Sequence, residues 1–378
     1  MTKAFTGFII AVMALIIVGV VMLYSTGAYA RDAHGDALFF IKRQGAFLCL
    51  GVVACAVVSF LDYHLLQRYW KWLFGAAVIL LVAVFFFPKV NGAHRWIKIG
   101  GLSFQPSELG KLAALAFLAA WYSRHQASVR TFRHGFLYPL AIVGILMVLI
   151  GAEVDVGTMS LIGATTLLLM YAAEVRKLYL FLLGFLGVCG IAGIVYMIPQ
   201  RLARMMAFLD LEGTKEGLGF QQWMALIALG SGGVYGKGLG NGRQKMEFLP
   251  FAHTDFIFPM IGEELGLLGT LFVVGCYVLL VVCGIAIAIH ARDRFGGLLA
   301  FAITAMWGVQ AAINIGVTTA LLPNKGIALP FISYGGSSLL FSLIEVGLMI
   351  SIYRLGLSEQ EVQVKVHLPQ RRVIIPRI

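Results

Sequence analysis

The chain has 378 residues, of which 60% are hydrophobic and only 12% are charged. About a quarter of the residues of a soluble domain are charged, so this composition excludes an ordinary soluble protein and indicates one that crosses a membrane several times. Lysine and arginine outnumber aspartate and glutamate by 29 to 18. That excess suits membrane edges and anionic headgroups better than nucleic acid, because no basic run with interleaved aromatic residues lies outside the apolar stretches.

Apolar stretches of near-spanning length predict an all-α polytopic membrane protein with about ten transmembrane helices. Their expected ranges are 5–28, 45–61, 72–88, 107–122, 137–152, 158–174, 178–198, 256–289, 297–322 and 334–354. The run at 256–289 exceeds what a bilayer requires, so it should be tilted, kinked or projecting into water. Residues 199–255 form a large external loop between helices seven and eight, in which an amphipathic helix around Trp223 to Leu229 could lie in the interface plane.

The basic residues of the short loops predict the orientation. They favour a multi-pass protein of the cytoplasmic membrane with both termini in the cytoplasm, since positive loops stay inside. Residues 1–354 then form the ten-helix domain, and residues 355–378 form a basic, loosely ordered cytoplasmic tail. The five cysteines lie inside apolar runs without C-x-x-C spacing, so we interpret them as small hydrophobic residues.

One stretch, Gly236 to Gly266, brings a glycine-rich polar loop up to the start of the eighth helix. It places Asp255 where the chain passes from water into lipid, and an ionisable group at that depth indicates a functional site. The alternative is that Asp255 is a helix N-cap. The functional interpretation is favoured by the charged and polar neighbours: His253, Arg243, Lys245, Glu263 and Glu264.

Residues 230–244 are dense enough in glycine for backbone N–H groups to approach a phosphate. Neither G-x-G-x-x-G nor the P-loop spacing is present, so nucleotide binding is not expected. The positive charge that a pyrophosphate requires is available in the external loop of residues 199–255: Arg201, Arg204, Lys237, Arg243 and Lys245. For any single one of these residues, a solvated charge without a function is the simpler interpretation.

The segment from residue 91 to 112 is also unusually polar for a connector. It offers two cations and a flat apolar surface: Arg95, Lys98 and Trp96. Ser107 is a candidate cap for the fourth helix, and Glu108 and Lys111 share one helical face at i, i+3. That pair either neutralises itself so that the helix can insert, or contacts substrate.

A third segment, residues 323–347, contains Ser333-Tyr334-Gly335-Gly336-Ser337-Ser338, a small polar start to the last helix that allows close backbone packing. Deeper in that helix, Glu345 must face a polar cavity or be protonated. Glu153 and Asp155, between helices five and six, lie on the same outer side. Together these segments suit work on an anionic, lipid-linked substrate at the external leaflet. No H-E-x-x-H, G-x-S-x-G or His/Cys metal spacing is present.

Four of these stretches, in order, resemble one known family: NGAHRWIKIGGLSFQPSELGKL, ALIALGSGGVYGKGLGNGRQK, LPFAHTDFIFPMIGEELG and KGIALPFISYGGSSLL. They are similar to the SEDS family (shape, elongation, division and sporulation), the lipid II polymerases of the bacterial cell wall. The similarity covers the chain from about Phe5 to Arg354 and looks more like the division branch, FtsW, than the elongation branch, RodA. The usual E-P-D-L-G reads EVDVG here, with Val154 for proline.

The resemblance implies a peptidoglycan glycosyltransferase that polymerises lipid II on the outer face of the cytoplasmic membrane, at the division septum. Implied partners are lipid II, a class B penicillin-binding transpeptidase of the FtsI type, other divisome proteins and membrane lipid, but no nucleic acid. The family's essential aspartate falls on Asp255. Its tryptophan falls on Trp96 beside Arg95, and its fourth-helix glutamate and lysine fall on Glu108 and Lys111.

The mechanism we expect has Asp255 as the catalytic base, accepting the proton of the acceptor sugar's C4 hydroxyl. The substrate-binding candidates are Arg95, Trp96, Lys98, Glu108, Lys111, Arg243, Lys245 and His253. Among them, Arg95, Lys98, Arg243 and Lys245 would stabilise the departing lipid pyrophosphate. A divalent cation such as Mg²⁺ or Mn²⁺ could share that role, although no cofactor or metal ligand is assigned. A lipid II flippase, an elongation-type polymerase and a non-catalytic scaffold are the alternatives.

Overall fold

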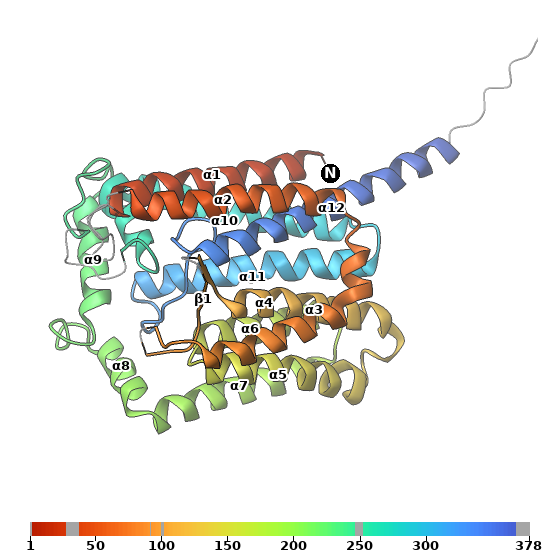
Figure 1. Cartoon of the computed structure of the whole chain (residues 1–378), viewed down its shortest axis with the longest axis horizontal. Helices are drawn as coiled ribbons and strands as arrows, with labels where there is room; N and C mark the ends of the chain where they lie inside the picture. The colour runs from red at the N-terminus through yellow and green to blue at the C-terminus, as the bar shows by residue number, and fades with distance from the viewer. Residues whose placement is uncertain (1, 28–37, 91, 100–101, 246–251, 368–378) are drawn as a thin grey trace, which may run out of the picture.

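The computed structural model describes residues 2–27, 38–90, 92–99, 102–245 and 252–367. Over these residues the protein is a bundle of long helices with two short helices and a small hairpin toward one end (Figure 1). The bundle helices are α1 (Thr2–Gly27), α2 (Phe39–Phe60), α3 (His64–Ala83), α4 (Pro106–Arg124), α5 (Tyr138–Ala152), α6 (Val156–Ala172), α7 (Lys177–Met197), α10 (Ile257–Ile289), α11 (Arg294–Thr318) and α12 (Gly336–His367). The other elements are α8 (Pro199–Leu209), α9 (Phe220–Gly232), β1 (Ile97–Ile99) and β2 (Leu102–Phe104).

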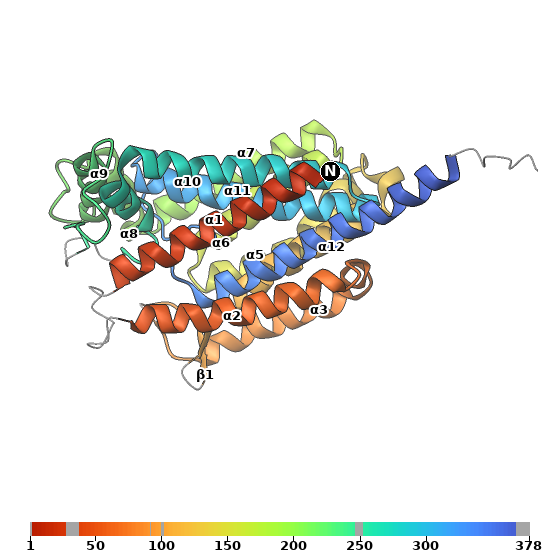
Figure 2. The same cartoon turned by 90° about the horizontal axis from the view of Figure 1, so that it is seen from above.

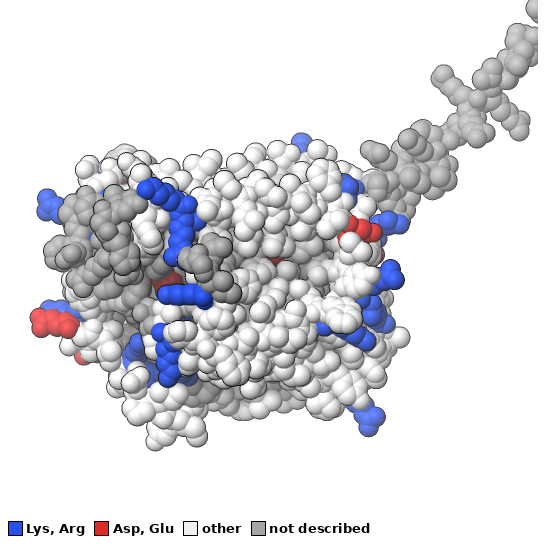
Figure 3. Space-filling view, viewed as in Figure 1, with Lys and Arg blue, Asp and Glu red and all other residues white. Residues whose placement is uncertain are grey.

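The expected all-α architecture with about ten bundle helices is confirmed. Within the described ranges, eight helices are long and apolar enough to cross a membrane, and α6 is a shorter apolar helix. The tenth, α4, carries polar residues in its first turn but packs against α3 and α11. Lysine and arginine gather toward the two ends of the molecule and leave the middle of the visible face largely uncharged, as a lipid-facing belt requires (Figure 3).

The two ends of the bundle differ in what they carry. Two views at right angles place the N-terminus and the far end of α12 at one end, and α8, α9 and the β1–β2 hairpin toward the other (Figures 1 and 2). The connection from α7 to α10, which contains α8 and α9, therefore lies at the end opposite the N-terminus. Any site formed by these connections is separated from the N-terminus by the full length of the bundle.

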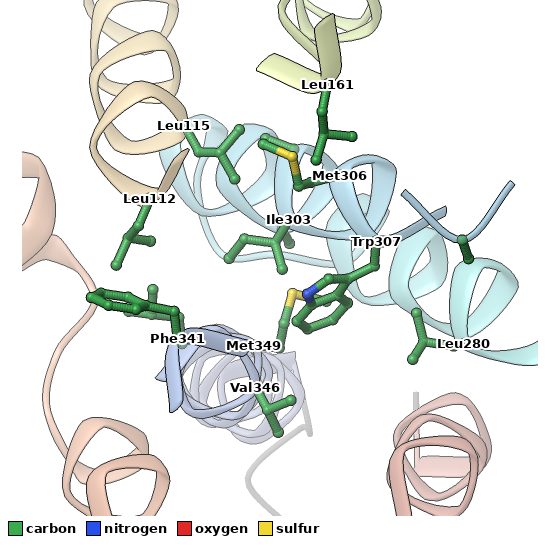
Figure 4. Close-up of a cluster of buried hydrophobic side chains, with 14 of the residues drawn as sticks. Leu112, Leu115, Leu161, Leu280, Ile303, Met306, Trp307, Phe341, Val346 and Met349 are labelled. Carbon is green, nitrogen blue, oxygen red and sulfur yellow. The ribbon is translucent and has the colours of Figure 1, made fainter. Parts of the chain in front are cut away.

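The apolar core is centred on α11. This helix packs against α4, α6, α10 and α12, and its Trp307 is only 1% exposed. Figure 4 shows side chains from all five helices meeting around it: Leu112, Leu115, Leu161, Leu280, Ile303, Met306, Trp307, Phe341, Val346 and Met349. Such close packing holds the ends of α10 and α11 in fixed positions, and the loops that follow or precede them carry the polar groups described below.

Helix α10 is broken near its N-terminal end, and a kink was one of the outcomes expected from its excess length. Gly266 has φ 70° and ψ −165°, which only glycine adopts without strain. The segment after α9 fills the break: Leu267 N–H donates to the carbonyl of Gly233 at 2.9 Å, and Lys237 N–H donates to the carbonyl of Glu263 at 3.0 Å. The first part of α10 is thus hydrogen-bonded to the α9 connection as well as to its own helix.

Several boundaries differ from those expected. Helix α3 begins at His64 instead of near residue 72, because its first turns are polar but still helical. Helix α8 was not expected, since Pro199 was interpreted as a helix end. Helix α7 ends at Met197, and Pro199 is the first residue of an amphipathic helix. The last helix continues to His367, past Arg354, and residues 368–378 of the expected tail lie outside the described residues. Ser107 is not the cap of α4, because Gln105 holds that position.

Candidate functional site

Asp255 lies directly before α10 but does not cap it. The N-cap is Phe256, and no side chain makes a capping hydrogen bond there, so the capping prediction was wrong. Instead, Asn314 of α11 donates to the carbonyl of Asp255 at 2.8 Å and to the carbonyl of Ile327 at 2.7 Å. One amide therefore joins the aspartate to the loop between α11 and α12.

That loop also contacts the carboxylate itself. A Cβ atom added to Gly326 would lie 2.5 Å from Oδ2 of Asp255, so only a glycine fits beside the carboxylate in this arrangement. The side chain of Asp255 keeps partial contact with solvent. Burial nevertheless raises its pKa to about 6, against the opposing effect of Arg95 and with a further upward contribution from Asp155. A carboxylate with a pKa near 6 is suited to accept and release a proton near neutral pH.

Arg95 is the cation that acts most on Asp255. Its guanidinium donates to two backbone carbonyls, that of Glu153 at 3.4 Å and that of Val154 at 2.6 Å. Val154 has φ 67°, a conformation unavailable to the proline expected there, since proline fixes φ near −65°. The turn at EVDVG is thereby shaped so that its carbonyls hold the guanidinium in place.

Two further carboxyl groups belong to this turn. Asp155 caps α6, accepting from Thr158 N–H at 3.2 Å and from its hydroxyl at 2.8 Å. Glu153 is 1% exposed, and neither of its carboxyl oxygens has a hydrogen-bond partner among the described residues. Burial raises the pKa of Glu153 to about 8, and Asp155 raises it further while Arg95 lowers it. Glu153 is therefore a neutral acid at pH 7, placed beside the same arginine that acts on Asp255.

Three N–H groups of the glycine-rich loop bind carboxylates of the protein itself. Glu263 accepts from the N–H groups of Arg243 at 2.9 Å and Gln244 at 3.1 Å, and Glu264 accepts from Gly240 N–H at 3.0 Å. These three donors are not available to a phosphate in this structure, because two carboxylates from α10 already bind them. The absence of side chains on the glycines lets the backbone close around them.

The lysines of the same region pair with those carboxylates. Lys245 is 3% exposed and lies 2.7 Å from Glu264, while Ser25 of α1 contacts both groups at 2.7 Å. Lys237 lies 2.8 Å from Glu263. Lys245, proposed as a substrate contact, is thus placed in a buried contact between α1 and α10, whereas the side chain of Arg243 is exposed.

The remaining predicted residues fall into three places. His253 is half-buried against Phe40, with ring centroids 4.4 Å apart, and its carbonyl accepts from Tyr334 N–H at 3.0 Å. Trp96 is half-buried before β1, and Lys98 is exposed on that strand. The expected ion pair is confirmed, with Lys111 Nζ 2.8 Å from Glu108 Oε2. Buried Glu345 of α12 lies close enough for its charge to act on Lys111.

The sequence did not single out Asn314, Lys325 or Gly326. Asn314 had a detectable signal, since an amide within the apolar run of α11 needs a hydrogen-bonding partner. Gly326 and Lys325 had none, because their proximity to Asp255 depends on the packing of α10 against α11. Within the described part of the chain, no three histidine, cysteine or carboxylate side chains gather to hold a metal ion.

Fold and site together define a polytopic membrane protein with a partly buried aspartate beside cations at one end of its bundle. The family model described as "Cell cycle protein", which groups FtsW, RodA and SpoVE, matches residues 6–356. This chain belongs to that family.

Relatives and solved structures agree over nearly the whole length. The chain is 39% identical to the probable peptidoglycan glycosyltransferase FtsW of Geobacter sp. (strain M18), over 91% of this chain and 95% of the relative. It is 38% identical to stage V sporulation protein E of Bacillus subtilis (strain 168), over 92% and 96%.

Among solved structures, one chain comes from work on a peptidoglycan synthase complex that coordinates polymerization and crosslinking. It superposes with a TM-score of 0.77 at 26% identity, covering 93% of this chain and 97% of that one. The rod shape determining protein RodA of Thermus thermophilus superposes with a TM-score of 0.68 at 27% identity, covering 92% and 96%. The ten-helix arrangement is therefore the one that these membrane proteins share.

Proposed function

We propose that this chain is a peptidoglycan glycosyltransferase that polymerises lipid II on the outer face of the cytoplasmic membrane during septal wall synthesis. The observation that carries the proposal is Asp255. Its carboxylate has a pKa near 6, contacts Gly326 and interacts with the charge of Arg95, and its backbone carbonyl accepts a hydrogen bond from Asn314. Relatives named peptidoglycan glycosyltransferase FtsW, similar over nine tenths of the chain, support the same activity.

In the proposed reaction, Asp255 removes the proton from the acceptor sugar's C4 hydroxyl as that oxygen attacks the donor's anomeric carbon. The bond from that carbon to the diphosphate oxygen breaks, and its electron pair leaves with the lipid diphosphate. Arg95 holds positive charge near the reacting groups, in a position fixed by the Glu153 and Val154 carbonyls. Glu153, neutral at pH 7, adds no negative charge that would oppose the anionic substrate.

The proposed topology puts both termini in the cytoplasm. Supporting it, the connections at the N-terminal end of the bundle and the helix turns next to them contain basic residues, as the positive-inside rule requires: Arg68, Lys71, Arg130, Arg133, Arg176, Lys177, Arg292 and Arg294. The Asp255 end then faces outward, where a class B transpeptidase of the FtsI type and other divisome proteins would meet it. Mg²⁺ or Mn²⁺ dependence remains a proposal, tested by adding either ion after chelation with EDTA.

The decisive experiment is polymerisation of purified lipid II by the protein in liposomes, with and without a class B transpeptidase, followed as glycan strands on a gel. Wild-type protein should make strands, and Asp255→Asn should make none while keeping its thermal unfolding temperature. Asp210→Asn is the matched control, because Asp210 is an exposed carboxylate of the α8–α9 connection. Transport of lipid II without strands from folded wild-type protein would replace this proposal with the flippase.

A further inference from the structure

The cations at the end of the bundle that carries α8 and α9 differ in whether a carboxylate already pairs with them. Lys237 and Lys245 pair with Glu263 and Glu264. Lys325, Arg201 and Arg204 have no carboxylate within 4.0 Å among the described residues. Cations without an acidic partner are available to an anionic ligand.

Lys325 is held in place by its chain neighbours on both sides. Asn324 donates to the side-chain oxygen of Gln221 in α9 at 2.8 Å, which fixes the residue before it. Gly326 contacts the Asp255 carboxylate, and Ile327 accepts from Asn314 at 2.7 Å. The lysine is therefore presented one residue away from the contact with the proposed base, on a loop tied to α9 and α11.

The first residues of the α11–α12 loop are also hydrogen-bonded to α9. Gln222 of α9 donates through its amide nitrogen to the carbonyls of Val317 and Leu322, both at 2.8 Å. Because α8 leads into α9, this fastening connects the loop to the part of the chain that carries Arg201 and Arg204. These hydrogen bonds preorganise the loop that carries Lys325 against α9, and they involve none of the three cations themselves.

Lys325 interacts with several other positively charged side chains. Its pKa falls to about 8, first through burial and then through Arg201, Arg95 and Arg204, against the opposing effect of Asp155. Mutual repulsion within such a cluster is relieved when a group with several negative charges binds. Arginine is well matched to phosphate oxygens, which it can bind through two N–H groups at once.

We propose that Lys325, Arg201 and Arg204 form the subsite for the diphosphate of the lipid-linked sugar donor. This inference rests on the proposed function and assigns the leaving group to residues outside the glycine-rich loop. As the bond between the anomeric carbon and the diphosphate breaks, the electron pair passes to a diphosphate oxygen, and the fixed positive charge of Lys325 stabilises it. The lysine transfers no proton in this step. Lys325 directly precedes Gly326, which contacts the Asp255 carboxylate, so one loop carries the subsite lysine and also contacts the proposed base.

The test compares two competitors of lipid II polymerisation, undecaprenyl diphosphate and undecaprenyl monophosphate, in phosphatidylglycerol-containing liposomes. Wild-type protein should be inhibited at much lower concentration by the diphosphate. Arg201→Ala and Arg204→Ala should each reduce that preference at least fivefold, and Lys325→Arg should keep it. Lys215→Ala is the matched control, because Lys215 is an exposed cation of the α8–α9 connection, and it should behave as wild type.

Lys325→Ala is tested by direct binding, since this variant should make few strands. Radiolabelled undecaprenyl diphosphate should bind purified wild-type protein and Lys215→Ala alike, and bind Lys325→Ala at least tenfold more weakly at an unchanged unfolding temperature. Wild-type affinity in folded Lys325→Ala, or loss of affinity in Lys215→Ala, would overturn the subsite. Tight diphosphate binding by a wild-type protein that makes no strands would instead retain the subsite and reject the polymerase.

Discussion

Gly326 and Asp255, distant in sequence, are in direct contact: a Cβ on residue 326 would lie 2.5 Å from the aspartate's Oδ2 and 3.4 Å from its Cγ. Gly326→Ala must therefore push the carboxylate away from its present position. Because misplacing a catalytic group by about 1 Å can cost about a hundredfold in rate, we expect a fall in kcat of ten- to a hundredfold. Strand formation under saturating lipid II measures it.

Gly335→Ala is the control for that change. It adds the same methyl group to the same connection, where the nearest atom would be the Cβ of Ser338 at an ordinary 3.5 Å. Its rate should stay within about twofold of wild type. An equal loss in both variants would show that the loop, and not the carboxylate contact, determines activity.

The rate should depend on pH at both ends of the neutral range. Below about pH 6, Asp255 becomes protonated and cannot accept a proton, so the rate falls as pH decreases. Above about pH 8, Lys325 loses its charge and the leaving diphosphate is less well stabilised, so the rate falls as pH increases. A pH series of initial rates should therefore be bell-shaped.

Two variants separate the limbs of that profile. Lys325→Arg should extend activity to higher pH, because arginine keeps its charge throughout the accessible range. Arg95→Ala should move the acid limb to higher pH, since Arg95 lowers the pKa of Asp255. A basic limb that is unchanged in Lys325→Arg contradicts the assignment of Lys325.

Stability should depend strongly on the buried pair of Lys245 and Glu264, whose charged atoms lie 2.7 Å apart. Lys245→Met leaves Glu264 buried without its cation, which typically costs about 3–5 kcal/mol. Thermal unfolding of the detergent-solubilised protein should show a clear decrease in Tm, partly restored by adding Glu264→Gln. Arg243→Met, at an exposed position two residues away, should change Tm little.

Val154 should be a site where a smaller residue stabilises the protein. A β-branched side chain at φ 67° is strained, and Val154 is 50% exposed, so little apolar burial is lost on its removal. Val154→Gly should stabilise the fold by up to about 1 kcal/mol. Val154→Ile retains the strain and should leave Tm near the wild-type value. A decrease in Tm for Val154→Gly would mean that the side chain contributes packing.

The sequence predicts the bundle well because membrane helices depend mainly on local composition. Apolar length alone located ten helices and indicated that α10 was too long to be regular. It missed α8, since PQRLARMMAFL is amphipathic and the proline was interpreted only as a helix end. It also missed the hairpin, whose three-residue strands are too short to show a period of two.

The site was predicted only in part because its contacts are long-range. Asp255 could be identified from its position at the membrane edge, but the donors around it could not. Asn314 is 59 residues away in the sequence. Glycine density indicated free N–H groups, yet nothing local revealed that Glu263 and Glu264 would occupy them. Composition identifies which groups a loop can offer, whereas the fold decides which partner takes them.

The contact between Ser25 and Glu264 also constrains how the protein is made. The two residues are 239 positions apart in the chain. At about 5–20 residues per second, a ribosome needs tens of seconds to reach Glu264 after Ser25 has emerged. Helix α1 must therefore enter the membrane and wait there with its hydroxyl unpartnered by Lys245 and Glu264. The end of the bundle that contains the segment carrying Asp255 can close only when most of the chain has been synthesised.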